Sequence, residues 1–147
     1  MKLDKKGYDL IRKHEGLRLK AYLCPAKIPT IGYGNTFYED GSKVKIGDEI
    51  TKEIADKLFE IIADDFADKV FKITKAKLTQ NQFNAIVSFA YNVGLTNYRN
   101  STLLKKVLFN PNSKDVELQF MRWTKAKGVE LTGLVNRRKD EVKLYYS

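Results

Sequence analysis

The sequence contains few of the residues that cross-link small proteins or bind metals. Its 147 residues include one Cys, one His and three Pro. A single Cys excludes an intramolecular disulfide framework, and one Cys with one His excludes a Cys/His zinc cluster. No run approaches the roughly 20 apolar residues of a membrane-spanning helix. We therefore predict no metal site, no cofactor and no stable membrane insertion, and we expect packing alone to stabilise the fold.

The N-terminus also lacks a targeting signal. Residues 1–6 carry charge from the second position, and no apolar segment follows, so we predict no signal peptide and synthesis in the cytoplasm. The formal charge of +9 favours polyanionic partners, namely nucleic acid, anionic lipid or wall polymers. The basic residues form no long block and accompany no nucleic-acid motif, which argues against nucleic acid. The 43% hydrophobic content, with 12% aromatic residues, predicts one folded domain, which we expect to be a monomer.

The hydrophobic spacing predicts a mainly helical α+β protein. Asp4 is placed to cap a helix that Gly16 ends, and Thr79 with Gln82 forms a capping box before a nearly all-apolar helix. Short β-branched and aromatic pieces separated by Pro and Gly predict a small antiparallel sheet. The predicted elements are a helix over about 4–15, a sheet over 17–44, and helices over 51–73, 79–93, 101–108, 113–123 and 132–145.

Three residues near the first predicted turn could carry chemistry. Glu15 ends the first helix, Cys24 follows after eight intervening residues, and Thr30 follows after five more. Partial burial of Glu15 would favour the neutral carboxylic acid that a general acid requires, although a Glu is commonly just a surface residue. Cys24 lies in a polar, proline-bounded loop, where modest stabilisation would populate thiolate; the alternative is a small buried apolar group. Thr30 could orient a water, or simply favour the strand.

This spacing resembles the catalytic pattern of the phage-type lysozymes, the endolysin muramidases of glycoside hydrolase family twenty-four, in which the middle position is Asp or Cys. The resemblance covers nearly the whole chain. The segments that carry it are 15–22, Thr30-Ile31-Gly32-Tyr33-Gly34, 88–94, 100–104, Trp123 and 133–138.

The resemblance implies a fold, a substrate and roles. The fold would have a small lobe of helix and β-hairpin over about 15–50, a connecting helix over 51–73, and a helical lobe of 74–147 with 1–14. The substrate would be peptidoglycan, cleaved at the β-1,4 bond from N-acetylmuramic acid to N-acetylglucosamine, which would lyse the host cell. Lacking a signal, the enzyme would reach the wall after release, with a holin as a candidate partner.

The site residues follow from the same resemblance. Glu15 would be the general acid, Cys24 would replace the carboxylate that assists water or stabilises positive charge, and Thr30 would help to hold the water. A neutral thiol stabilises charge poorly, whereas a thiolate would be both base and nucleophile. The expected sugar contacts are Gly32, Tyr33, Asn92 and Ser101, whose amides and hydroxyls complement sugar groups.

Five further residues are more ordinary. Phe89 and Trp123 have the helical spacing of core residues, although either could form a sugar platform. We interpret His14 as a structural histidine on the apolar side of its helix. Arg137 and Arg138 could pair with Glu141 on their own helix, or one of them could reach Glu15, and we assign neither a role.

Two other functions compete with hydrolysis. A lytic transglycosylase would cut the same glycan with one acid and no water, and Thr30 with a base-like residue at position 24 favours hydrolysis over it. A cationic protein without catalytic turnover could instead disrupt envelopes through charge and amphipathic helices. Replacement of Glu15 by Gln would separate these, because charge-driven disruption should survive it.

Overall fold

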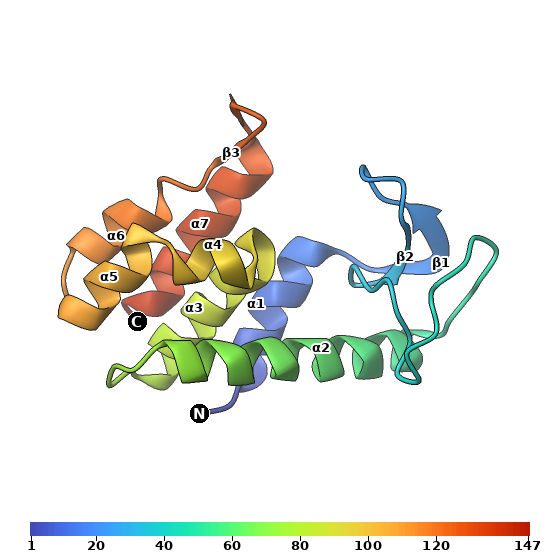
Figure 1. The fold of residues 1–147 in the computed structure, drawn as a ribbon, viewed down its shortest axis with the longest axis horizontal. Helices are drawn as coiled ribbons and strands as arrows, with labels where there is room; N and C mark the ends of the chain where they lie inside the picture. Colours follow the sequence, from blue (N-terminus) through green and yellow to red (C-terminus); the bar gives the residue numbers. More distant parts are fainter. The chain divides into compact units, whose positions relative to one another are not determined.

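The computed structural model describes all residues 1–147 and confirms a mainly helical α+β protein (Figure 1). The short strands form two separate antiparallel pairs, β1 with β2 and β3 with β4. No helix is both long enough and apolar enough to cross a membrane. The elements are α1 (Lys5–Glu15), β1 (Arg18–Leu23), β2 (Pro29–Gly32), α2 (Lys52–Ile73), α3 (Gln80–Val93), α4 (Leu95–Arg99), α5 (Thr102–Phe109), α6 (Asp115–Phe120), β3 (Lys125–Ala126), β4 (Val129–Glu130) and α7 (Thr132–Tyr145).

The chain divides into two compact units. Residues 12–64 form one, which we call the hairpin unit because it contains β1 and β2. Residues 1–11 and 65–147 form the other, which we call the discontinuous unit because two separate stretches of chain build it.

The helix ends follow local capping chemistry, as the sequence predicts. The Asp4 carboxylate accepts from the N–H of Gly7 at 3.2 Å at the start of α1, and Gly16 ends the helix with a φ of +70°. At α3, the Thr79 side chain accepts from the N–H of Gln82 while the Gln82 amide accepts from the N–H of Thr79. These reciprocal bonds satisfy two N–H groups that the helix itself leaves without partners.

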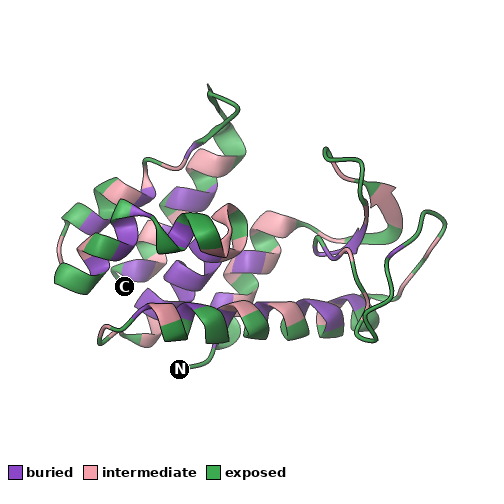
Figure 2. Cartoon of the chain, in the orientation of Figure 1, coloured by how far each residue is buried: buried purple, intermediate pink, exposed green.

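Helix α3 is the centre of the discontinuous unit. Nine consecutive residues, Gln82–Ala90, are buried, so this helix is covered on every side (Figure 2). The Phe89 ring packs edge-on against the rings of Phe120 and Trp123, each with a centroid separation of 5.5 Å. Phe89 is therefore a core residue, as its spacing predicts.

The N-terminal stretch is part of the same core. Gly7 lies so close to α3 that a Cβ on it would meet the Asn84 side-chain oxygen at 2.6 Å, which explains the need for glycine. The Asn84 amide also donates to the Asp4 carboxylate at 2.7 Å. These contacts join the first residues of the chain to a helix that begins about 75 residues later in the sequence.

The hairpin unit is built around one antiparallel pair. Tyr22 lies opposite Thr30, and Leu23 lies opposite Pro29. The connecting turn is closed by the N–H of Cys24 donating to the carbonyl of Ile28 and the N–H of Lys27 donating to the carbonyl of Cys24. Lys27 has a φ of +62°, the left-handed conformation that closes a three-residue hairpin loop.

Candidate active site

Glu15 and the glycine turn meet within the hairpin unit. Glu15 is the last residue of α1 and is half-buried. A Cβ placed on Gly34 would lie 3.5 Å from the Glu15 Oε2 atom, so the carboxylate lies against the main chain of this turn. Gly34 has a φ of +89°, and Gly32 has a φ of +68°, conformations that side chains rarely adopt. The Gly-Tyr-Gly sequence thus brings the main chain close to an acidic side chain.

The turn itself is rigidly closed. The N–H of Ile31 donates to the carbonyl of Asn35, and the N–H of Asn35 donates back to the carbonyl of Ile31, both at 2.9 Å. A Cβ on Gly32 would come within 3.2 Å of the buried Asn35 side-chain oxygen. A side chain at position 32 would therefore crowd this asparagine as well as adopt an unfavourable main-chain conformation.

Cys24 and Thr30 are held by the same carbonyl at the end of the β1–β2 hairpin. The Cys24 N–H donates to the Ile28 carbonyl at 3.1 Å, and the Thr30 hydroxyl donates to it at 2.8 Å. Thr30 is buried, and Cys24 is partly exposed. A hydroxyl has one proton, so the Thr30 proton serves either the Ile28 carbonyl or the Cys24 sulfur, while the Thr30 oxygen can accept from another group, such as a water.

The surroundings of Cys24 favour its thiolate. The main-chain N–H of Ile28 contributes most to lowering the pKa of the thiol, burial opposes it, and Ala26 and Thr30 lower the pKa further. A thiol with a lowered pKa supplies more of the anion that acts as a base or nucleophile.

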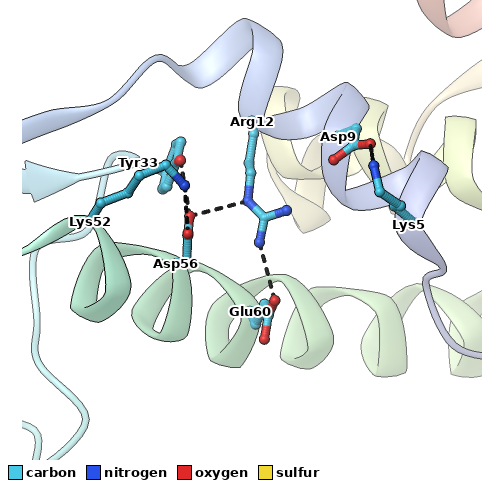
Figure 3. A network of polar contacts seen from close by, with 7 residues as sticks. All are labelled: Lys5, Asp9, Arg12, Tyr33, Lys52, Asp56 and Glu60. Atoms are coloured by element: carbon cyan, nitrogen blue, oxygen red, sulfur yellow. Dashed lines mark hydrogen bonds and ion pairs between the residues drawn. The ribbon is translucent and has the colours of Figure 1, made fainter.

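Tyr33 points into the unit and belongs to a charged network (Figure 3). Its side chain is buried, and its hydroxyl donates to the Asp56 Oδ1 atom at 3.0 Å. Asp56 also pairs with Lys52 at 2.8 Å and with Arg12 at 3.6 Å. Burial and the Asp56 carboxylate raise the pKa of Tyr33, which keeps its hydroxyl protonated as the donor.

The sequence did not identify this network, although it contained one local signal. Lys52 and Asp56 are four residues apart on one helix, the spacing of an i,i+4 ion pair. Nothing local connects Asp56 to Tyr33, because 23 residues separate them.

The two remaining predicted sugar contacts lie in the discontinuous unit. Asn92 is exposed near the end of α3, and its side-chain oxygen accepts from the Arg138 Nη2 atom at 2.6 Å. Ser101 is buried and caps α5: its hydroxyl accepts from the N–H of Leu104 and donates to the carbonyl of Tyr98. The Asn92 side-chain oxygen is therefore used by Arg138, while the Ser101 hydroxyl is used by the main chain.

Ser101 also lines a polar cavity of about 310 Å³. Trp123 is partly exposed there, so this ring contacts the Phe89 core and also faces the cavity. Hydroxyl, amide, guanidinium and indole groups make up the lining, which comes from Asn100, Ser101, Thr102, Gln119, Arg122 and Trp123. Such a mixture suits a sugar, which has polar hydroxyls and apolar ring faces.

Arg137 and Arg138 form a buried ion cluster with Glu141. Arg137 Nε lies 3.4 Å from Glu141 Oε2, and Arg138 Nε lies 2.9 Å from Glu141 Oε1. The Ser88 hydroxyl donates to Glu141 Oε2 at 2.6 Å. Burial raises the pKa of Glu141 against the opposing effect of both guanidinium groups, and burial lowers the pKa of Arg138 to about 10.

No group of three or more His, Cys, Asp or Glu is placed to hold a metal ion.

Comparison with known proteins gives consistent results. A family model described as phage lysozyme matches residues 12–141. An endolysin of Acyrthosiphon pisum secondary endosymbiont phage 1 is 40% identical over 154 residues, which cover 100% of this chain and 99% of that protein. An endolysin of Bacillus phage B103 is 42% identical over 99% of this chain, which spans 54% of that longer protein. The solved endolysin from Escherichia coli O157:H7 phage FAHEc1 is 39% identical, with a TM-score of 0.90 over 99% of this chain and 93% of that chain.

Proposed function

Because this chain belongs to the phage lysozyme family and is a glycoside hydrolase of the endolysin type, we propose that its substrate is the glycan of bacterial peptidoglycan. The bond cut is the β-1,4 linkage from N-acetylmuramic acid to N-acetylglucosamine. Cleavage weakens the wall and lyses the host cell. The enzyme works as a monomer, made in the cytoplasm and active on the wall after a holin or a comparable membrane lesion gives it access.

The observation that carries this proposal is the place of the Glu15 carboxylate. It lies against Gly34, in the unit that also holds Cys24 and Thr30 on one hairpin. Glycoside hydrolysis needs an acid for the leaving oxygen and a second group that activates water or attacks the sugar. Glu15 is the acid, Cys24 in its thiolate form is the second group, and Thr30 helps to hold the water.

The sugar contacts complete the proposal. Gly32 and Tyr33 shape the turn beside Glu15, and the buried Tyr33 ring contributes through the main chain that it anchors. Asn92 offers amide N–H groups, which suit acceptors such as the N-acetyl carbonyl. Ser101 contributes through the polar cavity that it lines.

Replacement of Glu15 by Gln tests the acid. The amide cannot donate the required proton, so we expect Glu15→Gln to lose lysis by about 10²–10⁴-fold while its circular dichroism stays that of the parent. Retention of more than about a tenth of the activity would refute the assignment.

The products test the reaction itself. Mass analysis of fragments from purified peptidoglycan should show reducing ends, because water attacks the anomeric carbon. Fragments that end in an internal anhydro ring would instead identify a lytic transglycosylase. Lysis by Glu15→Gln without any cleaved glycan would identify charge-driven disruption.

A further inference from the structure

Asp56 contacts two segments of the hairpin unit at once (Figure 3). It lies in the first part of α2, and its Oδ1 atom accepts from the Tyr33 hydroxyl at 3.0 Å. The same oxygen lies 3.6 Å from the Arg12 Nε atom, while Oδ2 pairs with Lys52 at 2.8 Å. Arg12 comes from α1 and Tyr33 from the glycine turn, so one carboxylate joins both segments to α2.

Arg12 fixes the last turn of α1. Its Nη2 atom donates to Glu60 at 3.1 Å, and its guanidinium lies over the Phe59 ring at 4.8 Å. Both partners belong to α2, as Asp56 does. Glu15 follows Arg12 by three residues, which places the two side chains on neighbouring positions of one helix face. Restraint of Arg12 therefore restrains the turn of helix that presents Glu15.

Tyr33 fixes the other side of the acid. It stands between Gly32 and Gly34, and its ring packs against Phe59 with a centroid separation of 5.3 Å. Gly34 is the residue against which the Glu15 carboxylate lies. The hydroxyl of Tyr33 thus anchors the turn that forms one wall around the acid.

The charges suit this bridging role. Hydrogen bonding from Lys52 is the largest cause that lowers the pKa of Asp56, and Tyr33 and Arg12 lower it further against burial. Asp56 is therefore an anion at neutral pH, and its side chain is only 29% exposed. Hydrogen bonds to an ionised acceptor are stronger and shorter than neutral ones, so they hold their donors in a narrower range of positions.

We propose that Asp56 is a positioning residue that holds the Glu15 carboxylate against the Gly34 turn, because it binds Arg12 and Tyr33 together. The inference rests on the proposed role of Glu15 as general acid. A general acid must lie within hydrogen-bond reach of the leaving oxygen, and a misplacement of about 1 Å can cost about 10²-fold in rate. Asp56 acts through Arg12 and Tyr33 and does not itself contact the sugar.

The experiment compares kcat and KM on soluble glycan oligomers from peptidoglycan. Asp56→Asn keeps the shape of the side chain and removes its charge, and Tyr33→Phe keeps the ring and removes only the hydroxyl. We expect Asp56→Asn to lower kcat by about 10–100-fold, and Tyr33→Phe by a smaller factor, with KM within about twofold of the parent. The double variant should be no slower than Asp56→Asn alone, since both changes break one link. Asp56→Glu should recover part of the lost rate.

Two control variants separate positioning from general stability. Asp68→Asn makes the same change on α2, in an exposed i,i+4 pair with Lys72 at 2.9 Å, and should leave kcat unchanged. Lys52→Met removes a partner of Asp56 without touching Arg12 or Tyr33, and should cost less than threefold. All rates are taken well below each variant's unfolding midpoint.

The outcomes are distinguishable. Folded Asp56→Asn and Tyr33→Phe with kcat within threefold of the parent would overturn the positioning role, even with Glu15→Gln inactive. Should Asp56→Asn fail to fold, Tyr33→Phe alone decides. An active Glu15→Gln would overturn both the proposed acid and the residue that positions it.

Discussion

Replacement of Glu141 by Gln should destabilise the discontinuous unit strongly. Glutamine keeps the shape of Glu141 but removes the negative charge that faces Arg137 and Arg138. The two arginine residues are 3% and 0% exposed, so water cannot take over the role of the lost carboxylate. Arg138 Nη1 is already buried without a hydrogen-bond partner, which makes the cluster more sensitive to lost charge.

The expected loss of unfolding free energy is that of removing one charged partner from a buried ion pair. Such changes destabilise by about 3–5 kcal/mol because they leave an uncompensated buried charge. For a chain of this size, each kcal/mol lowers the Tm by about 2–4 °C, so we expect a fall of about 6–20 °C. Thermal and urea unfolding, followed by circular dichroism, measure both quantities.

Two comparisons make the test specific. Asp65→Asn breaks an exposed i,i+4 pair with Lys69 and should change stability by less than about 0.5 kcal/mol. A triple change of Arg137 and Arg138 to Met and Glu141 to Leu should destabilise less than Glu141→Gln, because it leaves no buried charge uncompensated. A Glu141→Gln protein within about 1 kcal/mol of the parent would refute the reasoning.

Three further changes have defined outcomes. Cys24→Asp should keep substantial lysis and Cys24→Ser should lose most of it, since a hydroxyl ionises far less readily than a thiol. Thiol alkylation should inactivate the parent and spare the Asp variant. A fully active Ser variant with an unfolded Asp variant would show that Cys24 is merely packed. The pKa of Asp56 is lowered from its ordinary 3.8, so the carboxylate's contribution to stability is fully present above pH 3.8 and is lost as pH falls through the lower folded-state pKa. The difference in unfolding free energy between the parent and Asp56→Asn should therefore shrink in that acidic range. A difference that grows in acid would contradict the role of Asp56 as a stabilising anion. Lys127 and Gly128 have φ values of 51° and 79°, the pattern of a type I′ turn, in which a lysine at positive φ is strained and an asparagine is tolerated. Lys127→Asn should therefore raise the free energy of unfolding in urea by up to about 1 kcal/mol. A destabilised variant would show that Lys127 is not a source of strain.

The helices were predictable where local chemistry defines their ends. The cap at Asp4 and the capping box at Thr79 form as predicted, and the helix predicted from position 101 is capped by the Ser101 hydroxyl. Helix α4 was missed because its five residues have no side-chain cap. The β3–β4 hairpin was missed because its turn is Lys-Gly, without the Asn or Asp that usually signals such a turn.

Burial was harder to predict than helicity. Ile54 and Ile61 have helical spacing in the sequence, yet they are 47% and 40% exposed, whereas Ala55 and Ala63 of the same helix are fully buried. Which face of a helix is buried depends on what packs against it, and the spacing of large apolar residues does not contain that information. The pairing of Arg137 and Arg138 with Glu141 was predictable from their spacing on one helix, but its complete burial was not, since adjacent arginines are typical of a solvated face.

The residues proposed for the site that lie close together in sequence also share one compact unit. Glu15, Cys24, Thr30 and the glycine turn all lie in the hairpin unit. The link from Asp56 to Tyr33 depends on how α2 packs against the turn, which no local pattern specifies.

The division of the chain has a consequence for the order of folding. The hairpin unit is one continuous stretch, so a ribosome delivers it whole before most of its partner unit exists. The discontinuous unit needs residues 1–11, which emerge before the hairpin unit, together with α3, which emerges after it, and the Asn84 bond to Asp4 spans 80 positions. Closure of so long a loop is entropically costly and slow. Residues 1–11 therefore reach their native contacts late although they are synthesised before α3, and during that interval the apolar side of α1 remains exposed to other chains.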